Sequence, residues 1–286
     1  MSPRVVVTGS EGFVGGATIP VLEAHGFKVI RFDKKLGQDI CNPSDLRDVL
    51  RPGDRVLNLA AVARFKSCDE DPPEAYRTNT GGVAMLTQVA EELRVERVVH
   101  ASTASVYMPV WQAPISEHHP KGGNSHYGVS KYLGEKMFGL HQKVPFVILR
   151  YAHLYGPGKQ SGGLIDTFVD RIQRGAAPIL YGGAQSNDFT YIVDVARANL
   201  AALLTEHVNE DYNVGTGEET TTEGALELLS KLTHYTGPID RQAMRAVDAP
   251  KFVLSVDKAR RLLGWKPLWD FQTGLTETLK LVKFDT

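Results

Sequence analysis

A tyrosine and a lysine stand four residues apart in the segment Tyr127-Gly128-Val129-Ser130-Lys131. Within a helix, residues at i and i+4 lie on one face, so the Tyr127 hydroxyl and the Lys131 ammonium can address the same point. A lysine cation about 5 Å from a phenol stabilises the phenolate by about 3 kcal/mol at an effective dielectric constant near 20. The pair is therefore matched to abstraction of a proton from a substrate hydroxyl, although the same spacing also occurs on ordinary amphipathic helices.

Small hydroxyl residues follow a short apolar run at Ser102, Thr103 and Ser105. Where a parallel strand ends at a ligand cleft, such hydroxyls can hydrogen-bond a reacting oxygen. The same residue types also serve ordinary turns. Their position between the glycine-rich amino terminus and the tyrosine–lysine pair favours a role in binding the substrate.

Three glycines at Gly9, Gly12 and Gly15 follow the apolar run RVVVT with the spacing G-x-x-G-x-x-G. Glycine lets a backbone approach a pyrophosphate closely, and the N–H groups of the following helix, which starts near Phe13 and Val14, point at the phosphates. A tight turn is the alternative interpretation of glycines alone. A strand before and a helix after the motif favour a dinucleotide site.

The end of the next expected strand carries an acid, Asp33. A carboxylate at this place accepts hydrogen bonds from the adenosine ribose and repels a 2′-phosphate, so the sequence favours NAD. Lys34 and Lys35 follow directly and leave NADP as the less favoured cofactor.

The elements that must position these residues follow from apolar periodicity and turn signals. Short apolar runs predict strands at 4–8, 28–33, 55–59, 97–101, 146–149 and 179–181, and longer amphipathic stretches predict helices at 13–25, 43–50, 81–93, 125–141, 162–174, 192–204, 222–234 and 271–282. This alternation predicts an α/β fold with a doubly wound parallel Rossmann-type sheet and a smaller C-terminal substrate-binding lobe. We expect residues 1–175 to form the NAD-binding domain, about 189–215 to return to it, and 176–286 to supply mainly the lobe.

The composition is that of an ordinary globular enzyme. The 286 residues contain 32 Lys and Arg against 33 Asp and Glu, for a net charge of −1. That balance gives no electrostatic basis for a nucleic-acid or anionic-membrane partner. Two cysteines provide neither a disulfide framework nor a four-ligand metal site. We therefore expect a cytoplasmic protein without a metal, since no segment resembles a signal peptide or a membrane span.

The glycine turn, Asp33, the Ser/Thr strand end and the YGVSK segment together resemble the extended short-chain dehydrogenase/reductase superfamily, in its NAD-dependent epimerase/dehydratase branch. Later segments match further family blocks, namely LRYAHLYGPG, DFTYIVDVARA, YNVGTGE and LGWKP. The resemblance implies that Thr103 is the partner of the substrate hydroxyl, Tyr127 the acid and base, and Lys131 the ribose-binding group that lowers the tyrosine pKa. An oxidised nicotinamide would add to that lowering.

The resemblance also implies the remaining contacts. Cofactor contacts beyond the glycine turn are expected at Asp33, Asp39, Ile40, Leu59, Ala60, Ala61, Asn79, Ser102, Tyr127, Lys131, Tyr151 and His153. Substrate contacts are expected at Ala63, Thr103, Ser105, Tyr127, His153 and Asn187. Relatives form homodimers through two helices, which correspond here to 81–93 and 127–141. The apolar residues expected on those helices are Val83, Leu86, Val89, Ala90, Met137 and Phe138, and burial within the monomer is the alternative.

The residues after Thr103 narrow the reaction type. The 4,6-dehydratases of the family place Asp-Glu directly after this threonine, because eliminating water needs an extra acid and base, whereas this chain has Ala104-Ser105. The glutamate of the decarboxylases is also absent. We therefore expect an NAD-dependent epimerase of a nucleotide-linked sugar, acting through a keto intermediate. The alternative is an NAD(P)-dependent dehydrogenase or ketoreductase of a hydroxy or keto sugar, and a non-catalytic cofactor sensor is a third interpretation.

Departures from the family pattern concern the substrate. His153 stands where many relatives have Asn, and Asn187 replaces an Arg that commonly holds the diphosphate. A neutral amide cannot reproduce the bidentate, charged grip of a guanidinium. The cations that could compensate are Arg171, Arg241, Arg245 and Lys251.

Overall fold

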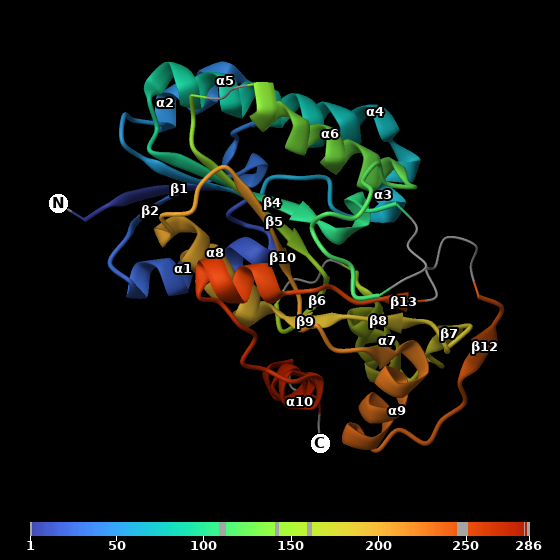
Figure 1. The fold of residues 1–286 in the computed structure, drawn as a ribbon. Coiled ribbons are helices and arrows are strands. Elements are labelled where there is room, and N and C mark those ends of the chain that lie inside the picture. Colours follow the sequence, from blue (N-terminus) through green and yellow to red (C-terminus); the bar gives the residue numbers. More distant parts are fainter. Residues whose placement is uncertain are drawn as a thin grey trace.

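In the computed structural model of the chain, the residues described are 2–108, 113–140, 143–158, 162–244, 251–282 and 284. Six strands build the central sheet: β1 (Arg4–Thr8), β2 (Lys28–Phe32), β3 (Arg55–Asn58), β4 (Arg97–Thr103), β5 (Phe146–Tyr151) and β10 (Glu210–Val214). They are parallel and lie in the order β10-β5-β4-β3-β1-β2 (Figure 1). The expected doubly wound Rossmann-type sheet is confirmed.

Both faces of this sheet are buried, which explains the unbroken apolar runs in the sequence. Val5 and Val7 of β1 belong to one core cluster and Val6 belongs to the other, and all three are fully buried. Side chains alternate between the faces of a strand, so a strand covered on both sides must be apolar at every position. The β-branched valines also suit the extended backbone.

Helices cover the two faces (Figure 1). On one face lie α2 (Pro43–Val49), α5 (Val83–Leu93) and α6 (His126–Leu140), and on the other α1 (Phe13–Ala24) and α8 (Ile192–Leu204). Short helical segments complete this layer: η1 (Lys34–Leu36), α3 (Phe65–Glu70), α4 (Pro72–Tyr76), η2 (Arg77–Gly82) and η3 (Ala104–Val106). Because α8 packs on α1 and β10 pairs with β5, residues 189–215 contribute to the sheet domain.

The second lobe lies beyond the carboxyl ends of the strands (Figure 1). Its helices are α7 (Leu164–Gln173), α9 (Thr222–Leu232) and α10 (Phe271–Leu281), with η4 (Ala259–Leu263) before the last. Short pairings involve β6 (His153–Tyr155), β7 (Ile179–Tyr181), β8 (Ser186–Asn187), β9 (Phe189–Tyr191), β11 (Thr220–Thr221), β12 (Asp240–Gln242) and β13 (Lys251–Phe252). The carboxyl ends of the sheet strands therefore lie on the side of the molecule that carries these short elements (Figure 1).

The expected elements are present with shifted ends, and some elements were not foreseen. The expected helix at 81–93 is preceded by a π-helical segment, η2, and α3 and α4 were not predicted. The expected helix end at 141 lies outside the described residues. Among the described residues, no helix has both the length and the apolarity to cross a membrane.

The apolar faces expected to meet in a dimer are instead used within the monomer. Val83, Leu86, Val89, Ala90 and Phe138 are at most 1% exposed and belong to the core cluster that covers the sheet. Met137 is partly buried against the same cluster. This part of the expectation was wrong, because an apolar helix face that covers a sheet has the same sequence pattern as one that covers a partner.

Asp194 on α8 anchors the segment before α10. Its Oδ2 accepts the N–H groups of Leu268 (2.9 Å) and Trp269 (3.0 Å), and its Oδ1 accepts from Arg197 (2.7 Å). The Asp194 carbonyl accepts from the buried indole of Trp265 at 3.0 Å. One fully buried carboxylate thus fastens the C-terminal segment to the sheet domain.

We predict that Asp194→Ala lowers the free energy of unfolding by about 3 kcal/mol, because two backbone N–H groups lose their acceptor. The measurement is the urea unfolding midpoint. Asp257→Asn is the matched control, since Asp257 is 78% exposed and its pair with Arg260 is 3.7 Å long. Equal midpoints for the two variants would contradict this assignment.

Candidate active site

Helix α6 brings the tyrosine–lysine pair to the carboxyl end of β4. The Thr103 side chain lies close enough to the Tyr127 hydroxyl to lower the pKa of Tyr127. One turn further, the Lys131 ammonium donates to the carbonyl of Ala101 at 2.6 Å. Thr103 and Ala101 flank one residue of the strand, so both functional groups of α6 lie at the same strand end. The sequence prediction that these residues meet at one point is consistent with this geometry.

The ring of Tyr127 is held from a third side by Phe65 of α3. The two rings are 5.1 Å apart in an edge-to-face arrangement, and Phe65 remains 49% exposed. Aromatic pairs of this geometry stabilise a fixed ring orientation. Sequence reasoning missed Phe65, because α3 has only six residues and carries mostly polar side chains.

The electrostatics of Tyr127 differ from expectation. Burial raises the pKa of Tyr127 to about 12, and the Thr103 side chain offsets only part of this rise. The expected lowering by Lys131 is not among the causes of this shift, which desolvation of the phenolate dominates. Tyr127 is therefore a neutral phenol near pH 7.

Lys131 is also perturbed by its surroundings. It is 3% exposed, and this burial lowers the pKa of Lys131 to about 8. The carboxylate of Glu135 acts in the opposite direction and favours the ammonium form. Lys131 therefore carries its charge below about pH 8 and loses it above.

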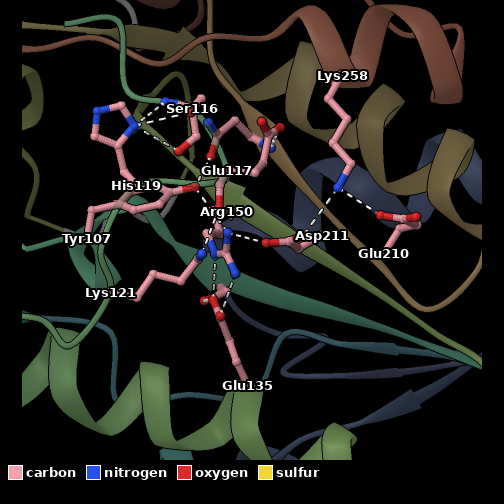
Figure 2. A network of polar contacts seen from close by, with 12 residues as sticks. Tyr107, Ser116, Glu117, His119, Lys121, Glu135, Arg150, Glu210, Asp211 and Lys258 are labelled. Atoms are coloured by element: carbon pink, nitrogen blue, oxygen red, sulfur yellow. Dashed lines mark hydrogen bonds and ion pairs between the residues drawn. The ribbon is translucent and has the colours of Figure 1, made fainter.

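A buried ion pair follows the tyrosine–lysine pair along α6. Glu135 accepts from Arg150 of β5 through both oxygens, at 2.9 Å from Nε and 2.8 Å from Nη2. Glu135 also accepts a hydrogen bond from the Ser102 hydroxyl. Figure 2 shows the Arg150 guanidinium between the carboxylates of Glu135 and Asp211, and an ion pair joins Arg150 to the latter.

The network continues toward the second lobe (Figure 2). Arg150 donates to the Tyr107 hydroxyl at 3.1 Å, and Tyr107 donates to Asn213 at 2.7 Å. Lys258 pairs with Asp211 at 3.2 Å and with Glu210 at 2.8 Å. These contacts connect α6 to the far edge of the sheet and to the segment around η4.

Close packing of the backbone explains why two residues of the turn after β1 must be glycine. Gly9 has φ +67°, and a Cβ there would lie 2.7 Å from the Leu59 backbone. A Cβ at Gly15 would lie 2.5 Å from the Ser10 carbonyl oxygen. The turn therefore lies directly over the end of β3, and α1 starts close to it. The first N–H groups of α1, at Phe13 and Val14, have no acceptor within the helix and can receive phosphate oxygens.

A pocket beside this turn fits the adenosine part of NAD. Its lining combines the glycine turn, apolar side chains and one carboxylate: Gly9, Phe32, Asp33, Lys34, Gln38, Ile40, Ala60, Ala61, Val62 and Thr78. Asp33 accepts the N–H of Glu11 (3.0 Å) and of Lys35 (2.9 Å), which leaves further acceptor capacity for ribose hydroxyls. Asp39 does not line the pocket; it pairs with Arg77 at 2.9 Å.

The two lysines that could have bound a 2′-phosphate have partners in the protein. Lys34 forms an ion pair with Glu74 at 2.7 Å, and the Lys35 ammonium donates to the Glu11 carbonyl at 2.9 Å. The Asp33 carboxylate remains the charged group of the ribose pocket. The residues present therefore fit NAD rather than NADP.

Asn79 fixes the loop after β3. Its amide accepts from the Val62 N–H at 2.9 Å and donates to the Val62 carbonyl and to Ser130, each at 3.0 Å. The side chain thus joins the loop that carries Leu59, Ala60 and Ala61 to helix α6, and its contact with the cofactor remains a prediction.

Two other expected cofactor residues have their hydroxyls in contact with the protein. Tyr151 is buried in the core and donates to Asn199 of α8. Ser102 donates to Glu135, as described above. Both hydroxyls therefore have partners within the protein, and the contact of these residues with a cofactor remains a prediction.

Several of the expected substrate residues follow the carboxyl ends of the neighbouring strands β3, β4 and β5. Ser105 donates its backbone N–H to Thr103 at 3.1 Å. Ala63 and His153 are exposed, and the His153 ring lies edge-on to Phe252 of β13 at 5.2 Å. His153 thus lies between the sheet domain and the short strands of the lobe.

Asn187 lies in the short strand β8, where its amide donates to Thr222 at 3.2 Å. Three of the cations that could replace the missing arginine have protein partners. Arg171 donates to the Ala177 carbonyl at 2.6 Å, while Arg241 pairs with Glu223 (2.7 Å) and Lys251 with Glu219 (3.1 Å). Arg245 lies outside the described residues.

Sequence reasoning missed the carboxylate of Asp188 beside Asn187. It is fully buried and accepts from the Thr216 N–H and hydroxyl, both at 2.7 Å, and from the Gly217 N–H at 3.0 Å. These bonds hold the YNVGTGE segment against β9. The aspartate of the DFTYIVDVARA block gave a signal, but only the fold reveals its partners.

Comparison with known proteins agrees with this geometry. The model of the NAD dependent epimerase/dehydratase family matches residues 5–215. A UDP-glucose 4-epimerase of Lacticaseibacillus casei is 26% identical, with 96% of this chain and 95% of that protein covered. The crystal structure of a UDP-glucose 4-epimerase with UDP-glucose from Thermotoga maritima superimposes with a TM-score of 0.91, at 28% identity and 98% coverage of both chains.

A second solved structure, the Thermus thermophilus UDP-glucose 4-epimerase in complex with NAD, gives a TM-score of 0.86 at 28% identity, covering 99% of this chain and 100% of the other. The family model spans most of the chain, and the glycine turn, the ribose pocket and the tyrosine–lysine pair lie inside it. The chain therefore belongs to the NAD dependent epimerase/dehydratase family.

Proposed function

We propose that this chain is an NAD-dependent epimerase that inverts a hydroxyl-bearing carbon of a nucleotide-linked sugar. The observation that carries the proposal is the placement of Tyr127 and Lys131 against Thr103 and Ala101 at the end of β4, in a fold whose glycine turn borders a pocket that fits the adenosine part of NAD. The similarity to UDP-glucose 4-epimerases over nearly the whole chain supports the same reaction class.

In this proposal each residue has a defined task. Thr103 orients the substrate hydroxyl, and Tyr127 removes its proton and later returns it. Lys131 binds the ribose of the cofactor and favours the phenolate by its charge. The glycine turn, Asp33 and Lys131 would hold NAD, which would supply the reversible acceptor for the hydride of the sugar carbon. The absence of an acid and a base at Ala104-Ser105 keeps elimination of water from competing.

The proposed substrate site extends from β4 toward the lobe. Ala63, Ser105 and His153 border the sugar, and Asn187 lies where the diphosphate would be held. The amide of Asn187 can donate a hydrogen bond but carries no charge, so we expect weaker diphosphate binding than an arginine would give.

We also propose a cytoplasmic homodimer formed through the outer faces of α5 and α6. The residues that cover the sheet are excluded from such an interface, because they are buried in the monomer. The outer face of α6 still exposes Leu133 (37%) and Leu140 (74%). These two leucines are the apolar residues that α6 can offer to a second copy.

Tyr127→Phe should lower kcat for interconversion of UDP-glucose and UDP-galactose by about 10²- to 10⁴-fold, because the acid and base are lost. NAD affinity should stay nearly unchanged. Proton NMR of the sugar anomeric signals measures turnover, and titration calorimetry measures binding. Tyr132→Phe, on the same helix but packed against a separate apolar cluster, is the matched control and should retain activity. Retained turnover in Tyr127→Phe would remove the assigned role.

The purified protein should carry NAD that survives desalting, because an epimerase regenerates its cofactor in every cycle. Denaturation should release close to one NAD per chain, measured by absorbance and mass spectrometry. Steady consumption of added NADH or NAD with a sugar substrate would instead indicate the dehydrogenase or ketoreductase alternative.

Asn187→Arg should tighten binding of UDP by about 10- to 100-fold if the diphosphate lies beside β8, because a bidentate charged contact replaces an amide. Asn187→Gln controls for size, and Asn187→Lys adds charge without the planar fork. Titration calorimetry with UDP measures the difference. If the Arg and Gln variants bind UDP equally, the diphosphate is held elsewhere.

A further inference from the structure

Three side chains on one face of α6, spaced four residues apart, contact the end of β4. Only two of them belong to the proposed chemistry. These two side chains are Tyr127 and Lys131. The third side chain is Glu135, one helical turn after Lys131, which accepts a hydrogen bond from the Ser102 hydroxyl. Ser102 is the residue between the two β4 positions that hold Tyr127 and Lys131.

Glu135 differs from the glutamate of a surface ion pair in its burial and in its contacts with two strands. It is 7% exposed, and its two oxygens accept from Arg150 and Ser102, which come from two different strands. A carboxylate buried in this way is costly unless every hydrogen bond is made. The contact fixes how far α6 lies along the end of β4.

We propose that Glu135 is a positioning residue for the reaction: its carboxylate keeps Lys131 in the charged form, and its contact with Ser102 holds α6 in register with β4. The inference rests on the proposed function for its consequence in turnover. Its physical basis is a property of the protein alone and can be measured without any turnover.

The electrostatic half follows from burial. Lys131 has lost most of its contact with water, which lowers the pKa of the ammonium, while the Glu135 carboxylate raises it. Positions i and i+4 lie on the same face of a helix, which places the carboxylate of Glu135 near the ammonium of Lys131. Without Glu135, a larger share of Lys131 is neutral near pH 8. A neutral amine gives the Tyr127 phenolate no charge stabilisation.

Among the groups that raise the pKa of Lys131, the Glu135 carboxylate has the largest effect and the Cys68 thiol a smaller one. Burial raises the pKa of the Cys68 thiol on α3, so it is mostly neutral at pH 8. Burial lowers the pKa of His100 on β4 far below its usual value, so its ring is neutral as well. Tyr127 on α6 is a neutral phenol. Arg150 on β5 is positive and lies on the far side of Glu135, paired to it.

The second part of the proposal, that Glu135 holds α6 in register with β4, rests on the contacts of its partner Arg150. Arg150 connects Glu135 to Asp211 on β10 and to the Tyr107 hydroxyl (Figure 2). Through Arg150, Glu135 of α6 is therefore connected to β5 and β10 as well as to β4. A shift of α6 along the sheet would break these bonds together, so the network resists the small displacements that would separate Tyr127 from Thr103.

The test compares Glu135→Gln with Asp211→Asn. Each variant removes one of the two carboxylates on Arg150, but only the first removes the charge beside Lys131. In the full-length protein labelled with ¹³C at lysine Cε, NMR should show the Lys131 titration shifted down by about 1 pH unit in Glu135→Gln and unchanged in Asp211→Asn. Lys131→Met identifies the signal.

The pH dependence of kcat should change in the same variant as the Lys131 titration. Activity requires charged Lys131, so the alkaline limb should move to lower pH in Glu135→Gln and stay in place in Asp211→Asn. Glu135→Asp keeps the charge and should restore the wild-type limb. Identical Lys131 titrations in the wild type and Glu135→Gln, or equal shifts in both variants, would overturn the proposal. A shifted titration without any turnover would contradict the proposed function alone.

If Glu135→Gln does not fold, Ser102→Ala tests the register half, since it keeps both charges. We expect kcat to fall by about 10-fold, with the Lys131 titration and NAD affinity unchanged, because the reacting groups lose their alignment but not their charge. An unchanged kcat in Ser102→Ala would overturn this half of the proposal.

Discussion

The contact between one face of α6 and the last residues of β4 is the constraint on which the site depends. A helix can present three side chains in a row at intervals of four residues, and a strand end can receive them only if the two elements keep a fixed offset. Here Tyr127 and Lys131 meet groups on either side of Ser102. The remaining architecture, from the core beneath α6 to the loop tied by Asn79, serves to maintain that offset.

Charge burial behind the site is arranged as a chain of alternating signs. Glu135, Arg150, Asp211 and Lys258 follow one another from α6 to η4, each paired with the next. In a low-dielectric interior such groups are tolerated only when every member has a partner. The chain therefore links the position of the catalytic helix to the edge of the sheet that joins the second lobe.

Local signals made much of the fold and of the site predictable from the sequence. Five of the six strands of the sheet are runs with apolar centres, whereas β10 (EDYNV) is mostly polar and was not predicted. The tyrosine–lysine spacing places both groups on one helical face wherever the helix lies. Glu135 escaped notice because a glutamate on a helix is ordinarily solvent-exposed, and its partner Arg150 comes from a different strand. Phe65 was missed because α3 is too short and polar to give a periodic signal. The apolar face of α5 was misassigned because covering a sheet and covering a partner require the same residues.

The protein by itself keeps its acid–base group inactive. Burial holds Tyr127 as a phenol with a pKa of about 12, and the same burial brings the pKa of Lys131 down to about 8. These two shifts have one cause, the removal of water from the end of β4, and they oppose the formation of a phenolate beside an ammonium. A further positive charge placed against the phenol favours its ionisation more strongly in this dry environment than it would in water. Desolvation thus makes the ionisation of Tyr127 depend strongly on any charge that lies beside its hydroxyl.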